Sequence, residues 1–300
     1  MSGDATRVTP ELLRNWPLPE GGDSKYSRGQ VVVAGGALRS AGAVMLAGTA
    51  ALRAGAGRLT LAVGASVATA VGTAVPESGI VPLPETRNGS VAGGALSAAA
   101  DDIRSADALL FGPGLDDLRT TRAQLDELPG MLGERTAVVL DAFALGCLPD
   151  ADETIEALRG RLVLTPNPAE AGILLGTEVD GTGAEDLDRA AREIADRFGA
   201  VVSCQNRVAE PGGRAWRITA GGPGLGTSGS GDVLAGAVAG LAARGADLAR
   251  AAVWGTALHA AAGDRLAARI GPLGYLAHEL ADELPGLLVR FGEGRPAREP

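Results

Sequence analysis

Short apolar runs alternate along this chain with longer, alanine-rich segments, and glycines mark many of the junctions between them. At the start of this pattern, the spacing predicts a strand, a helix and a second strand, at Gln30–Ala34, Ala41–Ala54 and Arg58–Val63. Two neighbouring strands joined through a helix lie parallel, because the chain must cross over between them. The alternation therefore predicts an α/β fold with a mostly parallel central sheet.

The same alternation continues toward the C-terminus. Further strands are predicted at Ala108–Phe111, Thr136–Asp141, Arg161–Thr165 and Ala200–Cys204. Helices are predicted at Pro10–Asn15, Ala95–Ser105, Thr120–Leu128, Ala169–Leu175, Ala184–Phe198, Val233–Arg244, Leu248–Ile270 and Gly274–Leu288. A hairpin is predicted around Pro211-Gly-Gly213. Because no linker or repeat separates these segments, we expect a single domain over residues 1–300, with residues 1–24 and 292–300 peripheral to it.

The composition excludes several classes of partner. The chain has 300 residues and a formal net charge of −9, so it has no electrostatic attraction to nucleic acids or anionic membranes. Neither the polar N-terminus nor the glycine-interrupted run Leu59–Pro76 has the pattern of a signal peptide or a membrane span. Cys147 and Cys204 lack metal-ligand spacing and are predicted to be buried. We expect a cytoplasmic protein that binds small molecules.

Several unusual loops are predicted to lie at one edge of the sheet. In open parallel sheets, ligands bind beyond the carboxyl ends of the strands. The segments expected at this edge are Gly35-Gly36, Gly112-Pro-Gly114, Asp141, Pro166-Asn-Pro168 and Gly222–Asp232. Their common location predicts a shared cleft.

The segment Gly222–Gly236 is the strongest functional signal in the chain. A glycine-rich turn leads through Asp232 into an apolar helix. Such a turn directs backbone N–H groups at one point, and the helix dipole adds positive charge there, which favours a phosphate group. An aspartate beside a phosphate has a chemical use if it takes the proton of a hydroxyl that attacks the phosphoryl group. The alternative is a glycine-rich loop in which Asp232 only supplies charge to the helix N-terminus.

Other common motifs are absent or misplaced. No Gly-x-x-x-x-Gly-Lys-Ser/Thr sequence occurs, so the chain is not a P-loop enzyme. Gly224, Gly226 and Gly229 have dinucleotide-binding spacing, but they follow a predicted hairpin instead of an opening strand. His259 and His278 form no metal-binding pattern, and we expect His259 to pack or to support another residue.

The Gly229-Ser-Gly-Asp232 motif, followed by Val-Leu-Ala-Gly, resembles the signature of the ribokinase-like superfamily. Within it, roughly residues 25–290 resemble the ADP/ATP-dependent NAD(P)H-hydrate dehydratases. The segments that carry this resemblance are Lys25–Gly29 with the strand that follows it, Ala50–Gly57, Phe111–Leu115, Val138–Ala142, Leu164–Glu170, Gly222–Gly236 and Ala257–His259. The resemblance implies a three-layer α/β/α fold and the stand-alone form, without an epimerase domain.

The resemblance also implies a reaction. In this family the substrate is NADH or NADPH that has gained water at C6 of the nicotinamide ring. ADP or ATP, with Mg²⁺, phosphorylates the new hydroxyl, and elimination of phosphate restores the double bond. Asp232 would be the catalytic base, and a homo-oligomer is plausible from the habit of the family. No metal-ligating residue is assigned. The implied phosphate- and nucleotide-binding residues are Gly229, Ser230, Gly231, Cys204, Gln205, Asn206, Arg207 and Val208, and the implied substrate-binding residues are Ala43, Gly114, Asn167 and Asp232.

The chain departs from the family pattern at three places. Asn167 replaces a histidine, Asp141-Ala-Phe143 replaces Asp-Ala-Asp, and Cys204–Val208 replaces Lys-Gly-x-x-Thr, with Arg207 as the candidate cation. Two alternatives to the dehydratase follow: a small-molecule kinase of the hydroxyethylthiazole-kinase type, and a nucleotide-binding protein without turnover. A kinase leaves a stable phosphate ester, a dehydratase releases phosphate, and a binding protein does neither.

Overall fold

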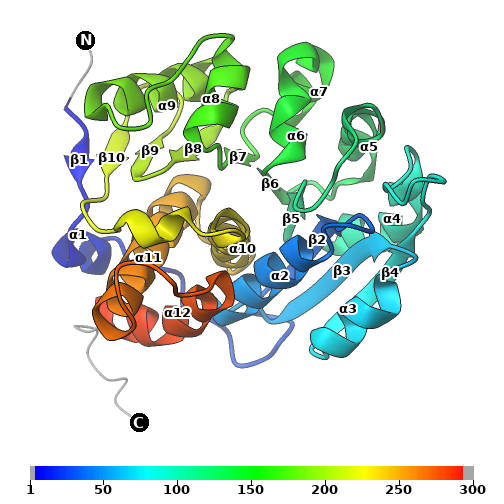
Figure 1. Cartoon of the computed structure of the whole chain (residues 1–300), viewed down its shortest axis with the longest axis horizontal. Helices are drawn as coiled ribbons and strands as arrows, with labels where there is room; N and C mark the ends of the chain where they lie inside the picture. Colours follow the sequence, from blue (N-terminus) through cyan, green and yellow to red (C-terminus); the bar gives the residue numbers. More distant parts are fainter. Residues whose placement is uncertain (1–3, 293–300) are drawn as a thin grey trace.

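The computed structural model describes residues 4–292, in which strands form one continuous sheet with helices on both faces (Figure 1). The strands are β1 (Thr6–Arg7), β2 (Gln30–Gly35), β3 (Arg58–Gly64), β4 (Ser78–Leu83), β5 (Ala108–Phe111), β6 (Ala137–Leu140), β7 (Leu162–Leu164), β8 (Val201–Cys204), β9 (Arg207–Ala209) and β10 (Ala215–Arg217). Their order in the sheet is β1-β10-β9-β8-β7-β6-β5-β2-β3-β4.

The helices complete three layers. The α-helices are α1 (Pro10–Asn15), α2 (Gly42–Arg53), α3 (Ala68–Ala74), α4 (Ala100–Ser105), α5 (Leu118–Met131), α6 (Phe143–Gly146), α7 (Asp152–Leu158), α8 (Pro168–Leu175), α9 (Ala184–Phe198), α10 (Ser230–Ala243), α11 (Leu248–Arg269) and α12 (Ala277–Gly292). Short 3₁₀ turns lie at Ala95–Ala99 (η1), Leu148–Asp150 (η2) and Pro223–Gly226 (η3). Figure 1 shows α4 to α9 on one face and α2, α3 and α10 to α12 on the other, which confirms the predicted three-layer α/β/α arrangement.

The order of the strands places a topological switch point between β2 and β5. The chain proceeds from β2 outward through β3 and β4, and then returns to the other side of β2 as β5. From β5 it continues in parallel through β6, β7 and β8. Among the paired strands of residues 4–292, only the pairings of β9 with β8 and β10 are antiparallel, and the pairing of β9 with β10 confirms the predicted hairpin. A switch point opens a crevice at the carboxyl ends of the strands, so the expected cleft has a structural basis.

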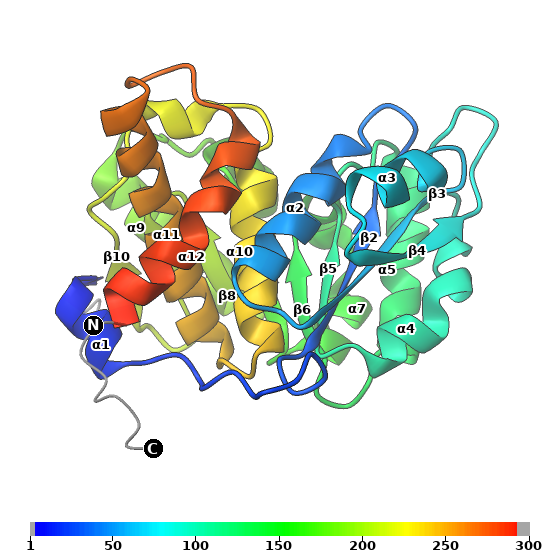
Figure 2. The ribbon, with the colours of Figure 1, turned by 90° about the horizontal axis from the view of Figure 1, so that it is seen from below.

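Small side chains bring α10 close to α2. A Cβ atom added at Gly236 or Gly240 would collide with the backbone oxygen of Ala47 or Ala51. The two helices can approach this closely because glycine and alanine present almost no side chain at the contact. Figure 2 shows the two helices side by side in front of the sheet. This packing fixes the N-terminus of α10 at the carboxyl edge of the sheet.

The sequence missed several elements. It did not predict α3, β4, α6, α7 or the short strand β1, which pairs in parallel with β10 at one edge of the sheet. It also began the glycine-rich helix at Val233, whereas α10 begins at Ser230 and includes Gly231 and Asp232 in its first turn. The predicted tail beyond Gly292 lies outside the described residues. Across residues 4–292, none of the helices combines the length and apolar character needed to cross a membrane.

Candidate active site

The loops after β2 and β5 are tied together at the switch point. The Gly36 amide donates to the Pro113 carbonyl at 2.9 Å, and the Ala37 amide donates to the Gly114 carbonyl at 2.8 Å. A Cβ added at Gly114 would be 3.2 Å from the Cβ of Ala43, at the start of α2. Ala43 and Gly114, both predicted to contact the substrate, are therefore neighbours at this end of the cleft.

The N-terminus of α10 lies at the same edge of the sheet. Gly229 is its N-cap and has a φ of 87°, a backbone conformation that glycine adopts without strain. No side chain caps this end of α10. A Cβ added at Gly231 would meet no atom within 4 Å, so the first turn borders open space. Because the first N–H groups of a helix have no partner within the helix, this end suits an anion.

A cavity of about 470 Å³ begins at this helix end. It is lined by Thr165, Pro166, Asn167, Pro168, Gln205, Asn206, Ala220, Gly221, Gly222, Pro223, Leu225, Gly226, Ser230, Gly231, Leu234, Thr256, His259 and Ala260. Five of the residues predicted from the sequence, Asn167, Gln205, Asn206, Ser230 and Gly231, are in this lining, and they come from three separate segments of the chain. The volume is within the range of small-molecule sites.

His259 supports the helix end from α11. Its Nε2 lies 2.9 Å from the Ser230 hydroxyl, and both side chains are buried. Burial lowers the pKa of His259 to about 4, so the imidazole is neutral at pH 7. An unprotonated Nε2 can accept a hydrogen bond from the Ser230 hydroxyl. This contact fits the supporting role for His259 that the sequence suggested.

The segment from Cys204 to Val208 is divided between the cavity and the core. Gln205 and Asn206 line the cavity, whereas the side chains of Cys204 and Val208 are completely buried. Arg207 is also buried, and its Nε lies 2.6 Å from a carboxylate oxygen of Asp188 in α9. The guanidinium of Arg207 is therefore engaged by Asp188, and its Nη1 also donates a hydrogen bond to Oδ1 of Asn206 in the cavity lining. That Arg207 replaces the family's lysine beside the phosphates stays a prediction.

Three carboxyl groups interact at this edge of the sheet: Asp141, directly after β6, Glu170 in α8 and Asp232 in α10. Burial, with the negative charges of Asp232 and then Glu170, raises the pKa of Asp141 to about 8. Burial and the charge of Glu170 raise the pKa of Asp232 to about 6, and burial also raises the pKa of Glu170. At neutral pH, Asp232 is therefore mostly ionised while Asp141 is mostly protonated.

Local hydrogen bonds hold two of these acids. The Thr165 hydroxyl donates to Asp141 at 2.8 Å. Glu170 accepts from the Asn167 amide at 2.9 Å, and the Asn167 side chain accepts from the Glu170 amide at 2.9 Å, which forms a capping box at the start of α8. Sequence reasoning assigned no role to Glu170. The spacing of asparagine and glutamate could have predicted the cap, but not its proximity to Asp232.

The backbone is strained next to Asp141. Ala142 has a φ of 52° and a ψ of −123°, an unfavourable conformation for a residue with a Cβ. Its neighbour across the sheet edge, Gly112, has a φ of 124° and lies against the Asp141 carbonyl. Strain of this kind persists only where the surrounding structure enforces it, often at functional sites. Within residues 4–292, no three His, Cys, Asp or Glu side chains are grouped closely enough to hold a metal ion by themselves.

Comparison with known proteins identifies relatives over the whole described fold. The family description "NAD(P)H-hydrate dehydratase" matches residues 31–286. The chain is 43% identical over 301 residues to the ADP-dependent (S)-NAD(P)H-hydrate dehydratase of Xanthomonas campestris, an alignment that covers 98% of this chain and 100% of the relative. These matches confirm the resemblance drawn from the Gly229–Asp232 motif.

Solved structures agree with these relatives. The ADP/ATP-dependent NAD(P)H-hydrate dehydratase from Bacillus subtilis, co-crystallised with ATP and Mg²⁺, superposes with a TM-score of 0.78 at 25% identity, covering 96% of this chain and 99% of that chain. A hydroxyethylthiazole kinase from Pyrococcus horikoshii has a TM-score of 0.58 at 16% identity, with 94% of each chain covered, and shares the fold.

Proposed function

We propose that this chain, which belongs to the NAD(P)H-hydrate dehydratase family, uses ADP or ATP to convert hydrated NADH or NADPH back to the reduced cofactor. The observation that carries the proposal is the position of Asp232. Its carboxyl group lies in the first turn of α10, next to the exposed Gly231 that borders the cavity. A base and an anion-binding helix end therefore lie side by side, as phosphoryl transfer to a hydroxyl requires.

In this proposal, the nucleotide occupies the cavity and the hydrate lies toward Ala43 and Gly114. Gln205, Asn206 and Asn167 contact the nucleotide or the substrate from the cavity wall. The amides at the start of α10 bind the phosphoryl group that is transferred, and Ser230 is held in place by His259. Because the relative from Xanthomonas campestris is named as ADP-dependent, we propose ADP as the donor.

The reaction then has two steps. Asp232 accepts the proton of the C6 hydroxyl while that oxygen attacks the terminal phosphoryl group of ADP, and AMP is released. The phosphate ester next breaks at its carbon–oxygen bond, a proton leaves the neighbouring ring carbon, and the double bond forms again. The pKa of Asp232, about 6, leaves the carboxylate ionised at pH 7 and ready to accept a proton.

The acids of the cleft also fit Mg²⁺, which we propose as the cofactor. Asp141 and Glu170 have raised pKa values, the charge of Glu170 contributes to the shift of Asp141, and no basic side chain is among the causes of either shift. Mg²⁺ is usually held by one or two carboxylates together with the phosphates of a substrate. Asp141 and Glu170 would hold the ion, which would neutralise charge on the transferred phosphoryl group.

A turnover assay tests the proposal. Hydrated NADH is incubated with Mg²⁺ and either ADP or ATP, and the absorbance of the reduced nicotinamide is followed together with the release of inorganic phosphate. We expect recovery that requires the nucleotide and is lost in Asp232→Asn. A stable phosphate ester without recovery would instead indicate a kinase. Nucleotide binding in calorimetry without either product would indicate a binding protein.

A further inference from the structure

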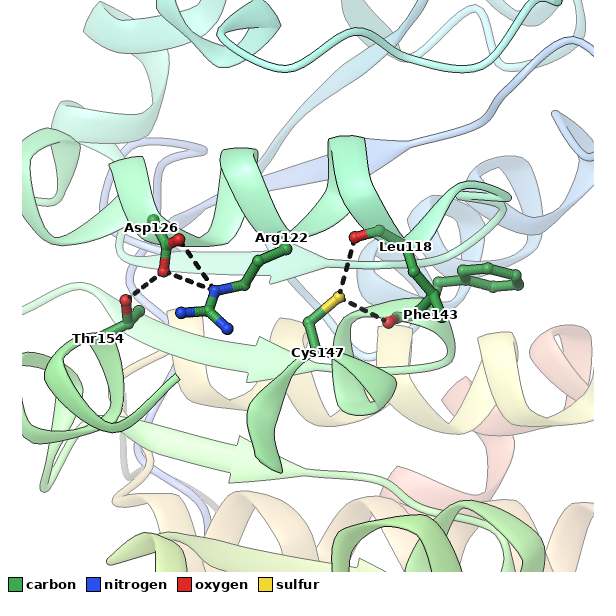
Figure 3. Close-up of polar contacts among 6 residues, drawn as sticks. All are labelled: Leu118, Arg122, Asp126, Phe143, Cys147 and Thr154. Carbon is green, nitrogen blue, oxygen red and sulfur yellow. Dashed lines mark hydrogen bonds and ion pairs between the residues drawn. The ribbon is translucent and has the colours of Figure 1, made fainter. Parts of the chain in front are cut away.

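Two large apolar side chains are exposed close together at the carboxyl edge of the sheet. Phe143, at the start of α6, is 39% exposed, and Leu118, at the start of α5, is 54% exposed. Figure 3 shows that both lie at the same end of their helices. A Cβ added at Gly146 would be 3.3 Å from Cδ2 of Leu118, so this leucine covers the surface of α6. Adjacent exposed apolar side chains often mark a binding surface.

This apolar pair, Leu118 and Phe143, continues the candidate active site. Phe111 of β5 is paired in register with Leu140 of β6. Gly114 and Phe143 each follow their strand by the same number of residues, so they lie beyond neighbouring strands at the same edge of the sheet. Gly114 in turn is next to Ala43, at the end of the cleft where we place the hydrate. The pair therefore lies beside the proposed substrate site, separate from the cavity.

The pair is held in position by its own surroundings. The Cys147 thiol lies 3.6 Å from the carbonyl oxygens of both Leu118 and Phe143, and Figure 3 shows how it joins the two helix starts. Burial raises the pKa of this thiol to about 11, so it remains a hydrogen-bond donor at neutral pH. The strained Ala142 directly precedes Phe143. A rigid apolar surface loses little entropy when it binds a ligand.

We propose that Phe143 and Leu118 bind the adenine ring of the dinucleotide substrate, an inference that rests on the proposed function. The C6 hydroxyl must reach Asp232, and the donor nucleotide fills the cavity on the side of β7, β8 and α11. The other half of the substrate then has to leave the cleft over the loops that follow β5 and β6. Adenine has flat apolar faces, which suit stacking on a phenylalanine ring.

The test compares a full substrate with one that lacks adenine. For hydrated NADH, we expect Phe143→Ala to raise KM roughly tenfold, the size expected for a lost stacking contact, with kcat little changed. For hydrated reduced nicotinamide mononucleotide, which has no adenine, KM should be the same in the wild type and in Phe143→Ala. Phe143→Trp, which keeps an aromatic ring, should retain the wild-type KM for hydrated NADH. Val289→Ala is the matched control, because Val289 is 66% exposed on α12, in the opposite layer of the fold.

Other results would overturn this inference. An equal rise in KM for both substrates would place Phe143 against the nicotinamide half. Unchanged KM values for both, with a new oligomeric state in light scattering, would make the pair a contact between copies of the chain. Unchanged KM values and an unchanged oligomeric state would remove any role in binding. If the wild type turns over no hydrate, the proposed function fails, and the contact is tested separately by comparing the affinities of the wild type and Phe143→Ala for NADH and for reduced nicotinamide mononucleotide.

Discussion

At the scale of single residues, burial assigns different protonation states to neighbouring carboxyl groups. The pKa of Asp141 is raised to about 8 and that of Asp232 to about 6, and burial is the largest cause for both. At pH 7 the first is mostly neutral and the second mostly charged. In the absence of Mg²⁺, Asp141 can therefore serve as a hydrogen-bonding group while Asp232 serves as a base.

Replacing Asp232 tests its role as the base. We expect Asp232→Asn to lower kcat by roughly a hundredfold or more, the usual contribution of general base catalysis, while the affinity for ADP stays the same or improves because a negative charge is removed. In the wild type, kcat/KM should fall as the pH drops below about 6, where Asp232 takes up a proton. Steady-state kinetics and calorimetry measure both effects. A mutant with near-normal turnover would contradict the assignment.

Asp141 should affect stability in a pH-dependent way. The folded protein keeps a proton on this group up to about pH 8, whereas the unfolded chain loses it near the ordinary value of 3.8. Unfolding therefore releases a proton between these two pH values, and the stability falls as the pH rises through that window. Without Mg²⁺, Asp141→Asn should gain stability relative to the wild type, by roughly 1 kcal/mol or more at pH 8 and by less at pH 5. Denaturant titrations at the two pH values measure this. An equal effect at both would exclude the raised pKa.

At the scale of the element, α10 uses glycine for two different purposes. Gly236 and Gly240 let the helix pack against the backbone of α2, while Gly231 leaves space at the exposed N-terminus. The first two positions concern folding, and we propose that the third concerns binding.

Two substitutions in α10 separate these purposes. Gly231→Val should weaken ADP binding roughly tenfold or more, because the side chain projects into the open space beside the helix end, and it should leave the stability within about 1 kcal/mol of the wild type. Gly236→Val should destabilise the protein by several times more, since its side chain would collide with Ala47. Calorimetry and thermal unfolding distinguish the two. Unchanged ADP affinity in Gly231→Val would place the phosphate site elsewhere.

The elements that the sequence did not predict show which kinds of helix and strand lack a recognisable sequence pattern. The strands β5 and β8 are short apolar runs that a sequence displays directly. In contrast, β4 is a half-exposed edge strand whose apolar residues are few and are interrupted by Pro82, so it resembles a loop in the sequence. Helix α6 is a single turn whose start depends on the strained Ala142. Tertiary packing, which the local sequence does not encode, determines both elements.

At the scale of the whole molecule, the site is an assembly of distant segments. The glycine-rich segment that ends at Asp232 could be recognised in the sequence as the N-terminus of a helix, because its residues are consecutive in the chain. The interaction among Asp141, Glu170 and Asp232 could not be predicted, since it depends on β6 and β7 lying next to each other and on α10 packing against β6. The same is true of the ion pair between Arg207 and Asp188 of α9, because only the fold brings these two residues together.

The N-terminal segment should contribute to the stability of the fold without contributing to the active site. Trp16 stacks on Trp216 with ring centroids 5.6 Å apart, and its carbonyl accepts a hydrogen bond from Trp254 Nε1 at 2.9 Å. Neither ring lines the cavity at the N-terminus of α10. Trp16→Ala should therefore lower the free energy of unfolding by about 2 kcal/mol, because it removes a half-buried aromatic contact at the edge of the sheet.

The kinetic constants of Trp16→Ala should match the wild type at temperatures where both proteins are folded. Thermal unfolding measures the loss of stability, and the turnover assay measures kcat and KM. If Trp16→Ala has the same free energy of unfolding as the wild type, the N-terminal segment with β1 and α1 does not stabilise the sheet through this contact. A raised KM at low temperature would show that this edge is coupled to the cleft through α11, which carries both Trp254 and His259.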